Sequence, residues 1–210
     1  MRKILNKRLY IVAGKGGVGK STVSAALAKA VAATGKKVCI VQVDTHDRMG
    51  MLFGWEALEK NKICQVAENI DALNLEGRAS LEEYLLIVLR SRKLTNVIFG
   101  SSVYQYFVTA APGLKELMTI GKVSFLLDGN PSKRIPPSHD VVVLDAPATG
   151  HSINFLQTPM AVRDMINVGL VARETEKIID LLTDPNQTCL NLVSLPEEMP
   201  VNETIELYEA

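Results

Sequence analysis

The feature that most constrains the fold of this chain is a glycine-rich stretch close to its start. Residues Gly14 to Ser21 read Gly-Lys-Gly-Gly-Val-Gly-Lys-Ser and match the pattern G-x-x-x-x-G-K-[ST] in full. The apolar run Leu9 to Ala13 comes directly before this stretch, and a segment with helical character follows from Lys20. A buried strand, a glycine loop and a helix in this order form a phosphate-binding loop, or P-loop. The motif therefore predicts a nucleotide-binding α/β domain.

Each part of the loop has a physical reason to hold phosphates. The glycines let the backbone curl so that several N–H groups point at one anion, and the helix N-terminus adds its positive end. We expect Lys20 to reach the β- and γ-phosphates, Ser21 to coordinate Mg²⁺ and Thr22 to contact the α-phosphate. The predicted nucleotide-binding residues are Gly14, Lys15, Gly16, Gly17, Val18, Gly19, Lys20, Ser21 and Thr22.

Composition and charge narrow the classes of partner. The 210 residues suffice for one α/β domain and are few for two. Lys and Arg balance Asp and Glu at 23 each, so no global field favours nucleic acid or anionic lipid. No run approaches the ~18 apolar residues of a membrane span, and the basic start lacks a signal-peptide core. The three cysteines form no C-x-x-C pair. We expect a cytoplasmic protein with no nucleic-acid partner and no disulfide framework.

Short apolar runs rich in β-branched residues alternate with helix-length segments. The predicted strands are Leu9 to Ala13, Lys37 to Val43, Asp140 to Leu144 and Thr188 to Ser194, with Ala72 to Leu75 as a weaker candidate. Continuous apolar runs suit strands that are buried on both faces of a parallel sheet. The pattern predicts an α/β fold with a doubly wound, mostly parallel sheet.

One connection between strands is too long for a single crossover. The helix-like segments Glu82 to Lys93, Val103 to Ala110 and Gly113 to Leu127 together span roughly fifty residues. We expect a helical subdomain inserted at about residues 79–128 of a P-loop domain that covers residues 1–210. Near the end, Asn202 is the expected cap of a helix that begins at Glu203 and meets no stop signal, which predicts that the C-terminal part of the domain is missing.

Two aspartates follow predicted strands at the edge of the sheet where ligands bind. Asp44 follows Val43, at the end of the second strand, and is therefore placed to orient an attacking water, with Asp47 as a rival candidate. Asp145 follows Val143-Leu144 in the form of a Walker B motif, whose carboxylate contacts Mg²⁺ directly or through water.

Two further segments resemble a known family. Lys15 is not demanded by the general motif, and the string K-G-G-x-G-K-[ST] resembles the deviant P-loop class. The segment Asp145 to Pro159 is similar to the second switch of the arsenical pump-driving and tail-anchored-protein-targeting ATPases, which is close to D-T-A-P-T-G-H followed by L-Q-x-P. The segment Pro112 to Glu116 is also similar to their P-G-x-x-E piece. The resemblance covers most of the chain, from Leu9 to about Glu206.

This resemblance implies roles that the residue pattern alone does not assign. In the family, the extra lysine crosses a dimer interface to the partner's nucleotide, so Lys15 would act in trans like an arginine finger. The resemblance also places Asp44 in the first switch, although the segment after it departs from the family's D-P-A-H pattern. It implies ATP and Mg²⁺ as cofactors and a homodimer as the active form. The implied catalytic residues are Lys15, Lys20 and Asp44, and the second switch contains Pro147, Thr149, Gly150 and His151.

Three hypotheses describe the process to which ATP hydrolysis would be coupled. An arsenical-pump type would serve a membrane partner, but its metalloid cysteines have no counterpart between Cys64 and Cys189. A carrier of hydrophobic protein cargo would line a groove with Leu85, Leu86, Val88, Leu89, Met118, Phe125 and Leu126. A nucleotide-gated scaffold or regulator of the partition or septum-site type would turn over little ATP. We expect Mg²⁺-dependent ATP hydrolysis that couples nucleotide state to a conformational switch of the dimer.

Overall fold

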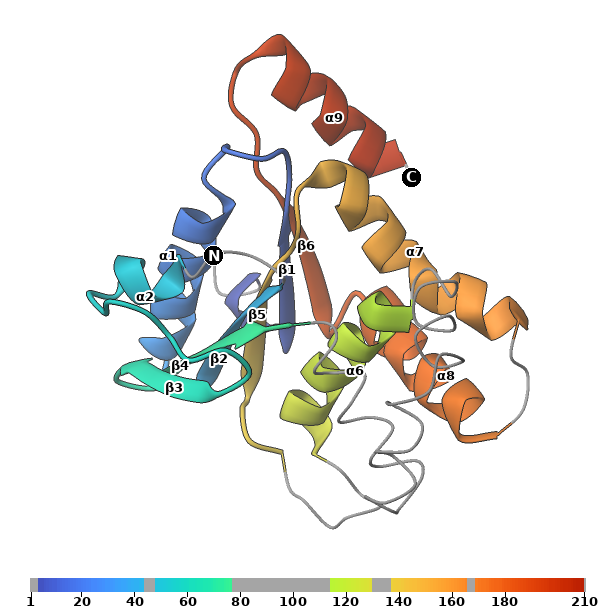
Figure 1. Ribbon diagram of the computed structural model, residues 1–210, viewed down its shortest axis with the longest axis horizontal. Helices are drawn as coiled ribbons and strands as arrows, with labels where there is room; N and C mark the ends of the chain where they lie inside the picture. Colours follow the sequence, from blue (N-terminus) through green and yellow to red (C-terminus); the bar gives the residue numbers. More distant parts are fainter. Residues whose placement is uncertain (1–3, 44–47, 77–113, 130–136, 166–168, 210) are drawn as a thin grey trace, which may run out of the picture.

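The computed structural model describes residues 4–43, 48–76, 114–129, 137–165 and 169–209 of the chain. In these parts six strands form one sheet in the order β3-β4-β2-β5-β1-β6 (Figure 1). The strands are β1 (Leu9–Ala13), β2 (Val38–Val43), β3 (Ile63–Ala67), β4 (Ile70–Leu75), β5 (Val141–Asp145) and β6 (Thr188–Leu192). All neighbours pair in parallel except β3 and β4.

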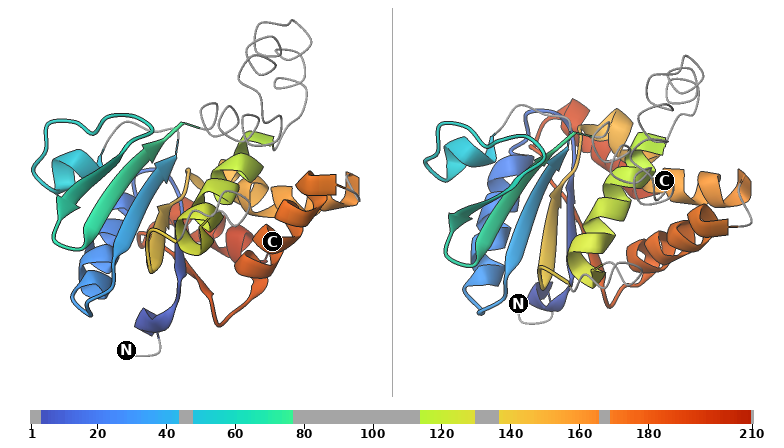
Figure 2. Two further views of the ribbon diagram at one scale, coloured as in Figure 1. Left: turned by 90° about the horizontal axis from the view of Figure 1, so that it is seen from below. Right: turned by 60° about the horizontal axis from the view of Figure 1, so that its bottom comes forward.

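Helices cover both faces of this sheet. They are α1 (Lys20–Ala32), α2 (Met49–Leu52), α6 (Leu114–Asp128), α7 (Thr149–Met165), α8 (Gly169–Thr183) and α9 (Glu198–Glu209), and a short 3-10 helix spans Ile4–Asn6. Figure 2 shows α1 on one side of the strands and α6, α7 and α8 on the other. The prediction of a doubly wound, mostly parallel α/β sheet is confirmed.

Alternate strand residues build a separate hydrophobic cluster on each face. Leu9 and Ile11 of β1 point to the cluster formed with α6, α7 and α8. Tyr10 and Val12 point to the cluster that contains the small residues of α1. Every residue of β1, β2 and β5 is buried, which explains why these strands are apolar apart from Gln42 and Asp145 and show no alternation.

Helix α6 belongs to the layer that covers the sheet. It matches the helix expected at Gly113 to Leu127, and it contacts β5, β2, α7 and α8. Met118 and Leu126, two candidates for a cargo groove, are buried in the cluster on this face. The other expected helices and the remaining groove candidates before residue 114 lie outside the described residues. The inserted subdomain therefore stays a prediction.

Some boundaries and one strand differ from the sequence expectations. Strand β3 was not expected because it is half exposed at the edge of the sheet and mixes polar with apolar residues. It turns into β4 through Asn69, which has a positive φ of 57°. Helix α9 begins at Glu198, five positions before the expected start, so Asn202 lies inside the helix and is not its cap. Pro200 falls in the first turn, where proline is tolerated. No helix within the described ranges has the length and apolar character needed to cross a membrane.

The end of the sheet where the parallel strands begin contains a polar cluster around two buried side chains, Asp71 and His139. His139 lies just before β5, and its Nε2 is 2.9 Å from Oδ2 of Asp71 at the start of β4. Its Nδ1 is 2.8 Å from the hydroxyl of Ser138. Lys37, just before β2, places its Nζ 3.4 Å from the same Asp71 oxygen. Three neighbouring strands, β4, β2 and β5, are thus joined by side chains at this end.

Candidate functional site

The glycine loop between β1 and α1 takes a conformation that only glycine adopts easily. Gly14, Gly17 and Gly19 have φ values of 145°, 88° and 93°. A Cβ on Gly14 would lie 2.2 Å from the backbone oxygen of Val193, so this position also excludes a side chain by contact. Gly19 is the N-cap of α1 and provides no side-chain cap. The first turn of α1 therefore directs its N–H groups into the loop, as an anion site requires.

The ammonium group of Lys20 lies against the loop. Its Nζ donates to the carbonyl oxygens of Gly14 and Lys15, both at 2.9 Å. Burial lowers the pKa of Lys20, and the negative charge of Asp145 opposes this shift. The loop, the positive end of α1 and this ammonium together form a cradle whose shape and charge fit a phosphate chain.

A carboxylate from β5 meets the start of α1. Asp145 is next to the P-loop because β5 pairs with β1, with Val12 opposite Asp145. The hydroxyls of Ser21 and Ser24 donate to its two carboxylate oxygens at 2.6 Å and 3.3 Å. Burial raises the pKa of Asp145, and the two hydroxyl hydrogen bonds oppose the rise. Sequence reasoning missed Ser24, although its spacing of three from Ser21 places both on one face of α1.

These oxygens fit a magnesium ion. A hydroxyl and a carboxylate oxygen meet at one point, and Mg²⁺ prefers oxygen ligands. Within the described residues no group of three or more His, Cys, Asp and Glu side chains could hold a metal by itself. Mg²⁺ usually takes one or two protein oxygens and completes its shell with water and phosphate. Ser21 and Asp145 are therefore the residues that would hold the ion.

Lys15 has a partner within its own chain. Its Nζ lies 2.6 Å from Oε1 of Glu203 in α9. Sequence reasoning missed Glu203, since nothing local connects two residues that are 188 positions apart. Figure 1 shows α9 running above the ends of β1 and β6, beside the loop that follows β1.

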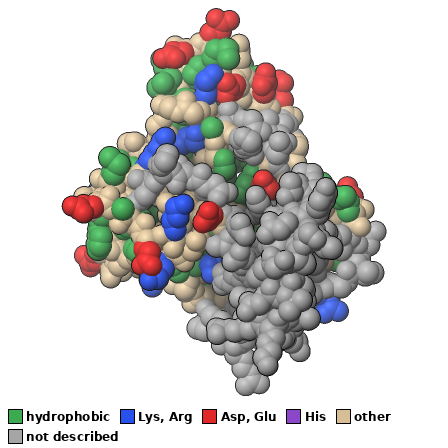
Figure 3. Space-filling view, viewed as in Figure 1, with side chains coloured by type: hydrophobic (Ala, Val, Ile, Leu, Met, Phe, Trp, Pro, Cys, Tyr) green, Lys and Arg blue, Asp and Glu red, His purple; other side chains and the backbone are tan. Residues whose placement is uncertain are grey.

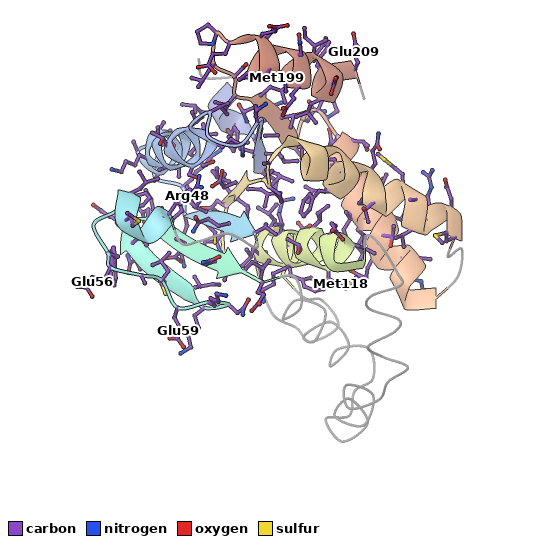
Figure 4. The ribbon with its side chains drawn as sticks, turned by 45° about the horizontal axis from the view of Figure 1, so that its top comes forward. Arg48, Glu56, Glu59, Met118, Met199 and Glu209 are labelled. Atoms are coloured by element: carbon purple, nitrogen blue, oxygen red, sulfur yellow. The ribbon has the colours of Figure 1, made fainter. Side chains whose placement is uncertain are left out.

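A buried amide of β2 holds the backbone at Arg48 and Met49. Gln42 pairs with Asp145 across the ladder of β2 and β5, and its Oε1 accepts the backbone N–H groups of Arg48 and Met49 at 3.1 Å and 3.3 Å. Arg48 is exposed and lies between α1 and α2 in Figure 4. Its charge lowers the pKa of both Lys20 and Asp145. Arg48 is a second site residue that sequence reasoning missed.

The segment expected to form the second switch follows Asp145 directly. Pro147 is half-buried, and a Cβ on Gly16 would lie 3.8 Å from the Cβ of Ala148, so this segment lies beside the P-loop. Thr149, Gly150 and His151 form the start of α7, but their side chains lie outside what the structure describes. The same holds for the whole of residues 44–47, which include Asp44 and Asp47.

The charge distribution at the surface agrees with an anion site in this place. In the space-filling view, basic side chains gather between α1 and α9, while acidic side chains are frequent over α9 itself (Figure 3). Lys15 is 30% exposed and pairs with an acidic side chain of α9 that is 25% exposed.

Comparison with known proteins gives consistent matches. Residues 7–170 match the sequence profile of the family described as anion-transporting ATPase. ATPase BagA of Mycobacterium tuberculosis is 34% identical over 206 residues, which cover 96% of this chain and 60% of that protein. A protein of Aquifex aeolicus provisionally named arsenical pump-driving ATPase 1 is 28% identical over 208 residues, covering 96% and 50%. ATPase GET3 of Chaetomium globosum is 24% identical over 200 residues, covering 94% and 56%. The chain thus spans between half and three-fifths of the length of these curated relatives.

Proposed function

This chain belongs to the anion-transporting ATPase family, and from that premise we propose that it binds ATP with Mg²⁺ and hydrolyses it as one half of a homodimer. The observation that carries the proposal is the meeting of three groups at the ends of β1 and β5. The Lys20 ammonium lies on the P-loop carbonyls at 2.9 Å, and the Ser21 hydroxyl lies 2.6 Å from the Asp145 carboxylate. These are the groups that a nucleotide triphosphate and its cation need.

The residues of the chain would divide the chemistry between them. Lys20 and the N–H groups of the loop bind and orient the phosphates, and Ser21 and Asp145 hold the cation. When bound, Mg²⁺ neutralises charge on the β- and γ-phosphate oxygens. Asp44 orients the attacking water, and Lys15 stabilises charge on the transferring group of a partner chain. Catalysis of this kind depends on position and charge, since phosphoryl transfer requires little covalent chemistry from the protein.

A nucleotide-dependent switch is supported by the place of α7. The segment that begins at Pro147 connects the Asp145 carboxylate to α7 directly, and Phe155 anchors α7 in the hydrophobic cluster on the sheet. We propose that contacts between the γ-phosphate and residues 147–151 shift α7, and that this shift reports nucleotide state to the dimer interface.

Calorimetry and a turnover assay test this proposal together. The 210-residue chain is titrated with Mg·ATP and Mg·ADP, and phosphate release is measured for the parent, Asp44→Asn and Lys36→Ala, the last as a control on an unrelated lysine. We expect binding in all three proteins and a loss of turnover only in Asp44→Asn, of roughly 100-fold or more. A folded parent chain that gives no heat with either nucleotide would contradict the proposal.

The scaffold alternative is separated by the same assay. A nucleotide-gated scaffold or regulator would bind Mg·ATP but release phosphate no faster than Asp44→Asn does. The partner classes, a membrane protein or a hydrophobic protein cargo, and the cytoplasmic location stay predictions. Met118 and Leu126, two candidates for a cargo groove, are buried against the sheet. The three cysteines, which a metalloid site would need, lie on three different strands, and Cys39 is fully buried. We therefore expect arsenite to leave turnover unchanged.

A further inference from the structure

An ion pair within the chain holds the one P-loop lysine that the general motif does not require. Lys15 Nζ lies 2.6 Å from Glu203 Oε1, and the two side chains are 30% and 25% exposed. At this distance the contact is a charge-assisted hydrogen bond, and partial burial reduces its screening by water and salt. The fold makes this pair, because β6 and the loop after it bring α9 beside the P-loop.

Glu203 is held in place by the helix that carries it. The N–H of Val193, just after β6, donates to the carbonyl oxygen of Ala13 at 2.9 Å, so the chain leaves the sheet beside the P-loop. Within α9, Pro200 and Leu207 are buried, and the helix contacts α7. Glu203 is one helical turn before Leu207 and therefore on the side of α9 that faces the protein.

The two lysines of the P-loop are positioned in different ways. Lys20 bonds to the carbonyl oxygens of Gly14 and Lys15, so its position is set within the loop. The position of the Lys15 ammonium is set by Glu203, from outside the loop. A single ammonium paired with Glu203 must weaken that contact to reach phosphate oxygens on another chain. A carboxylate at this place also repels an approaching triphosphate.

We propose that Glu203 is a positioning residue that restrains Lys15 within its own chain and so opposes the engagement of Lys15 with a partner chain's nucleotide. The inference rests on the proposed function, since it assigns a regulator to the trans role of Lys15. Partly exposed ion pairs are weak, so the restraint is modest and a partner's nucleotide overcomes it. Its expected size is a change of about two- to fivefold in the dimer dissociation constant.

Sedimentation velocity of the 210-residue chain with Mg·ATP or a transition-state mimic measures this effect. We expect Glu203→Gln to dimerise about two- to fivefold more tightly than the parent. Lys15→Ala should dimerise weakly, and Glu203→Gln should tighten the dimer less in the Lys15→Ala background than in the parent, because the restraint acts through Lys15 while the repulsion of a triphosphate does not. Glu206→Gln changes an exposed carboxylate of the same helix and should match the parent.

A second measurement does not depend on dimerisation. The rate at which an amine-reactive ester labels Lys15, followed by mass spectrometry without nucleotide, should rise about two- to fivefold in Glu203→Gln and stay unchanged in Glu206→Gln. The restraint would be overturned if Lys15 is labelled equally fast in Glu203→Gln and the parent, or if Glu203→Gln dimerises no more tightly than the parent. Either result would leave the proposed homodimer intact. If all variants bind Mg·ATP by calorimetry but none associates, the homodimer itself is wrong and the restraint falls with it.

Discussion

A buried aspartate lies at each end of the parallel strands, Asp71 where they begin and Asp145 where they end, and the two carboxylates have different neighbours. Where the parallel strands begin, Asp71 faces His139 Nε2 at 2.9 Å and Lys37 Nζ at 3.4 Å. Where they end, Asp145 accepts hydroxyl hydrogens from Ser21 and another serine of α1 at 2.6 Å and 3.3 Å. One carboxylate has a cation and an imidazole as neighbours, and the other has neutral hydroxyls in direct contact.

This difference distinguishes the end of the sheet where the strands begin from the ligand edge, the end where we propose that the nucleotide and its cation bind. Burying a carboxylate costs desolvation free energy; a neighbouring cation offsets part of this cost, and neutral hydroxyls offset less of it. Burial raises the pKa of Asp145 for this reason. A bound cation would remove much of that desolvation cost. The free protein is therefore less stable at this end of the sheet, and the same carboxylate gives affinity for the cation.

The largest expected effect is that of adding a side chain at Gly14, in the P-loop. Gly14→Ala should lower the free energy of unfolding by more than the roughly 1–3 kcal/mol of a strained backbone, because the added Cβ would lie 2.2 Å from the Val193 oxygen at a φ of 145°. Gly16→Ala is the matched control, since its Cβ meets no atom closer than 3.8 Å. Urea unfolding of both variants measures the difference. Equal stabilities would mean that the loop relaxes without cost.

Exchanging each aspartate for asparagine tests the comparison itself. Asp71→Asn should lower the free energy of unfolding by about 1 kcal/mol, the difference between hydrogen bonds to charged and to neutral groups. Asp145→Asn should raise it at neutral pH. The sign follows because a folded pKa above the unfolded value means that the ionised carboxylate is less favourable in the folded state at neutral pH.

Thermal unfolding of the two asparagine variants checks these opposite signs. A change of 1 kcal/mol corresponds to roughly 2–4 °C in Tm for a chain of this size. Asp145→Asn should also lose the effect of Mg²⁺ on Mg·ATP binding, whereas Asp71→Asn should retain it. Shifts of the same sign in both variants would break the comparison between the two ends of the sheet.

The pH dependence of stability tests the role of His139, at the end of the sheet where the strands begin. Burial lowers the pKa of His139 below its ordinary value of 6.5, and the contact with Asp71 opposes this shift in part. The unfolded chain therefore binds this proton at a higher pH than the folded chain does. The contribution of neutral His139 to the free energy of unfolding is fully present above the unfolded pKa. It is lost as pH falls from there through the folded pKa, with a slope of at most about 1.4 kcal/mol per pH unit.

Urea unfolding at about pH 7.5 and about pH 5.5 spans the upper part of this window. His139→Gln should be less stable than the parent and should show a smaller difference between the two pH values. An unchanged difference in the variant would assign the acid sensitivity to other groups.

The smallest effect is expected at Arg48. Its exposed guanidinium acts on Lys20 and Asp145 by charge and is held near them through the backbone contact with Gln42. Arg48→Ala should weaken Mg·ATP binding about two- to fivefold, with a shallower salt dependence than the parent, because screened charges of this kind contribute little. Arg48→Lys should retain most of the affinity. If Arg48→Ala binds Mg·ATP as tightly as the parent does, Arg48 has no role in nucleotide binding.

Sequence reasoning anticipated most of the elements that carry the site. Strands β1, β2, β5 and β6 and helices α1 and α6 were expected close to their observed bounds, because each is a continuous apolar run or a helical segment beside clear turn signals. It missed β3, whose half-exposed edge position leaves no apolar pattern. The family resemblance is also confirmed by the profile match, while the roles of individual residues stay predictions.

The sequence by itself determined the phosphate loop, because its geometry depends on local terms: glycines at positive φ, a strand before them and a helix N-terminus after them. Only the tertiary structure decided that β1 lies between β5 and β6. That order places Asp145 beside Ser21 and Glu203 beside Lys15. Strands buried on both faces are mostly apolar, so their sequences carry little information about which neighbour each will pair with. The packing of the whole sheet makes that choice.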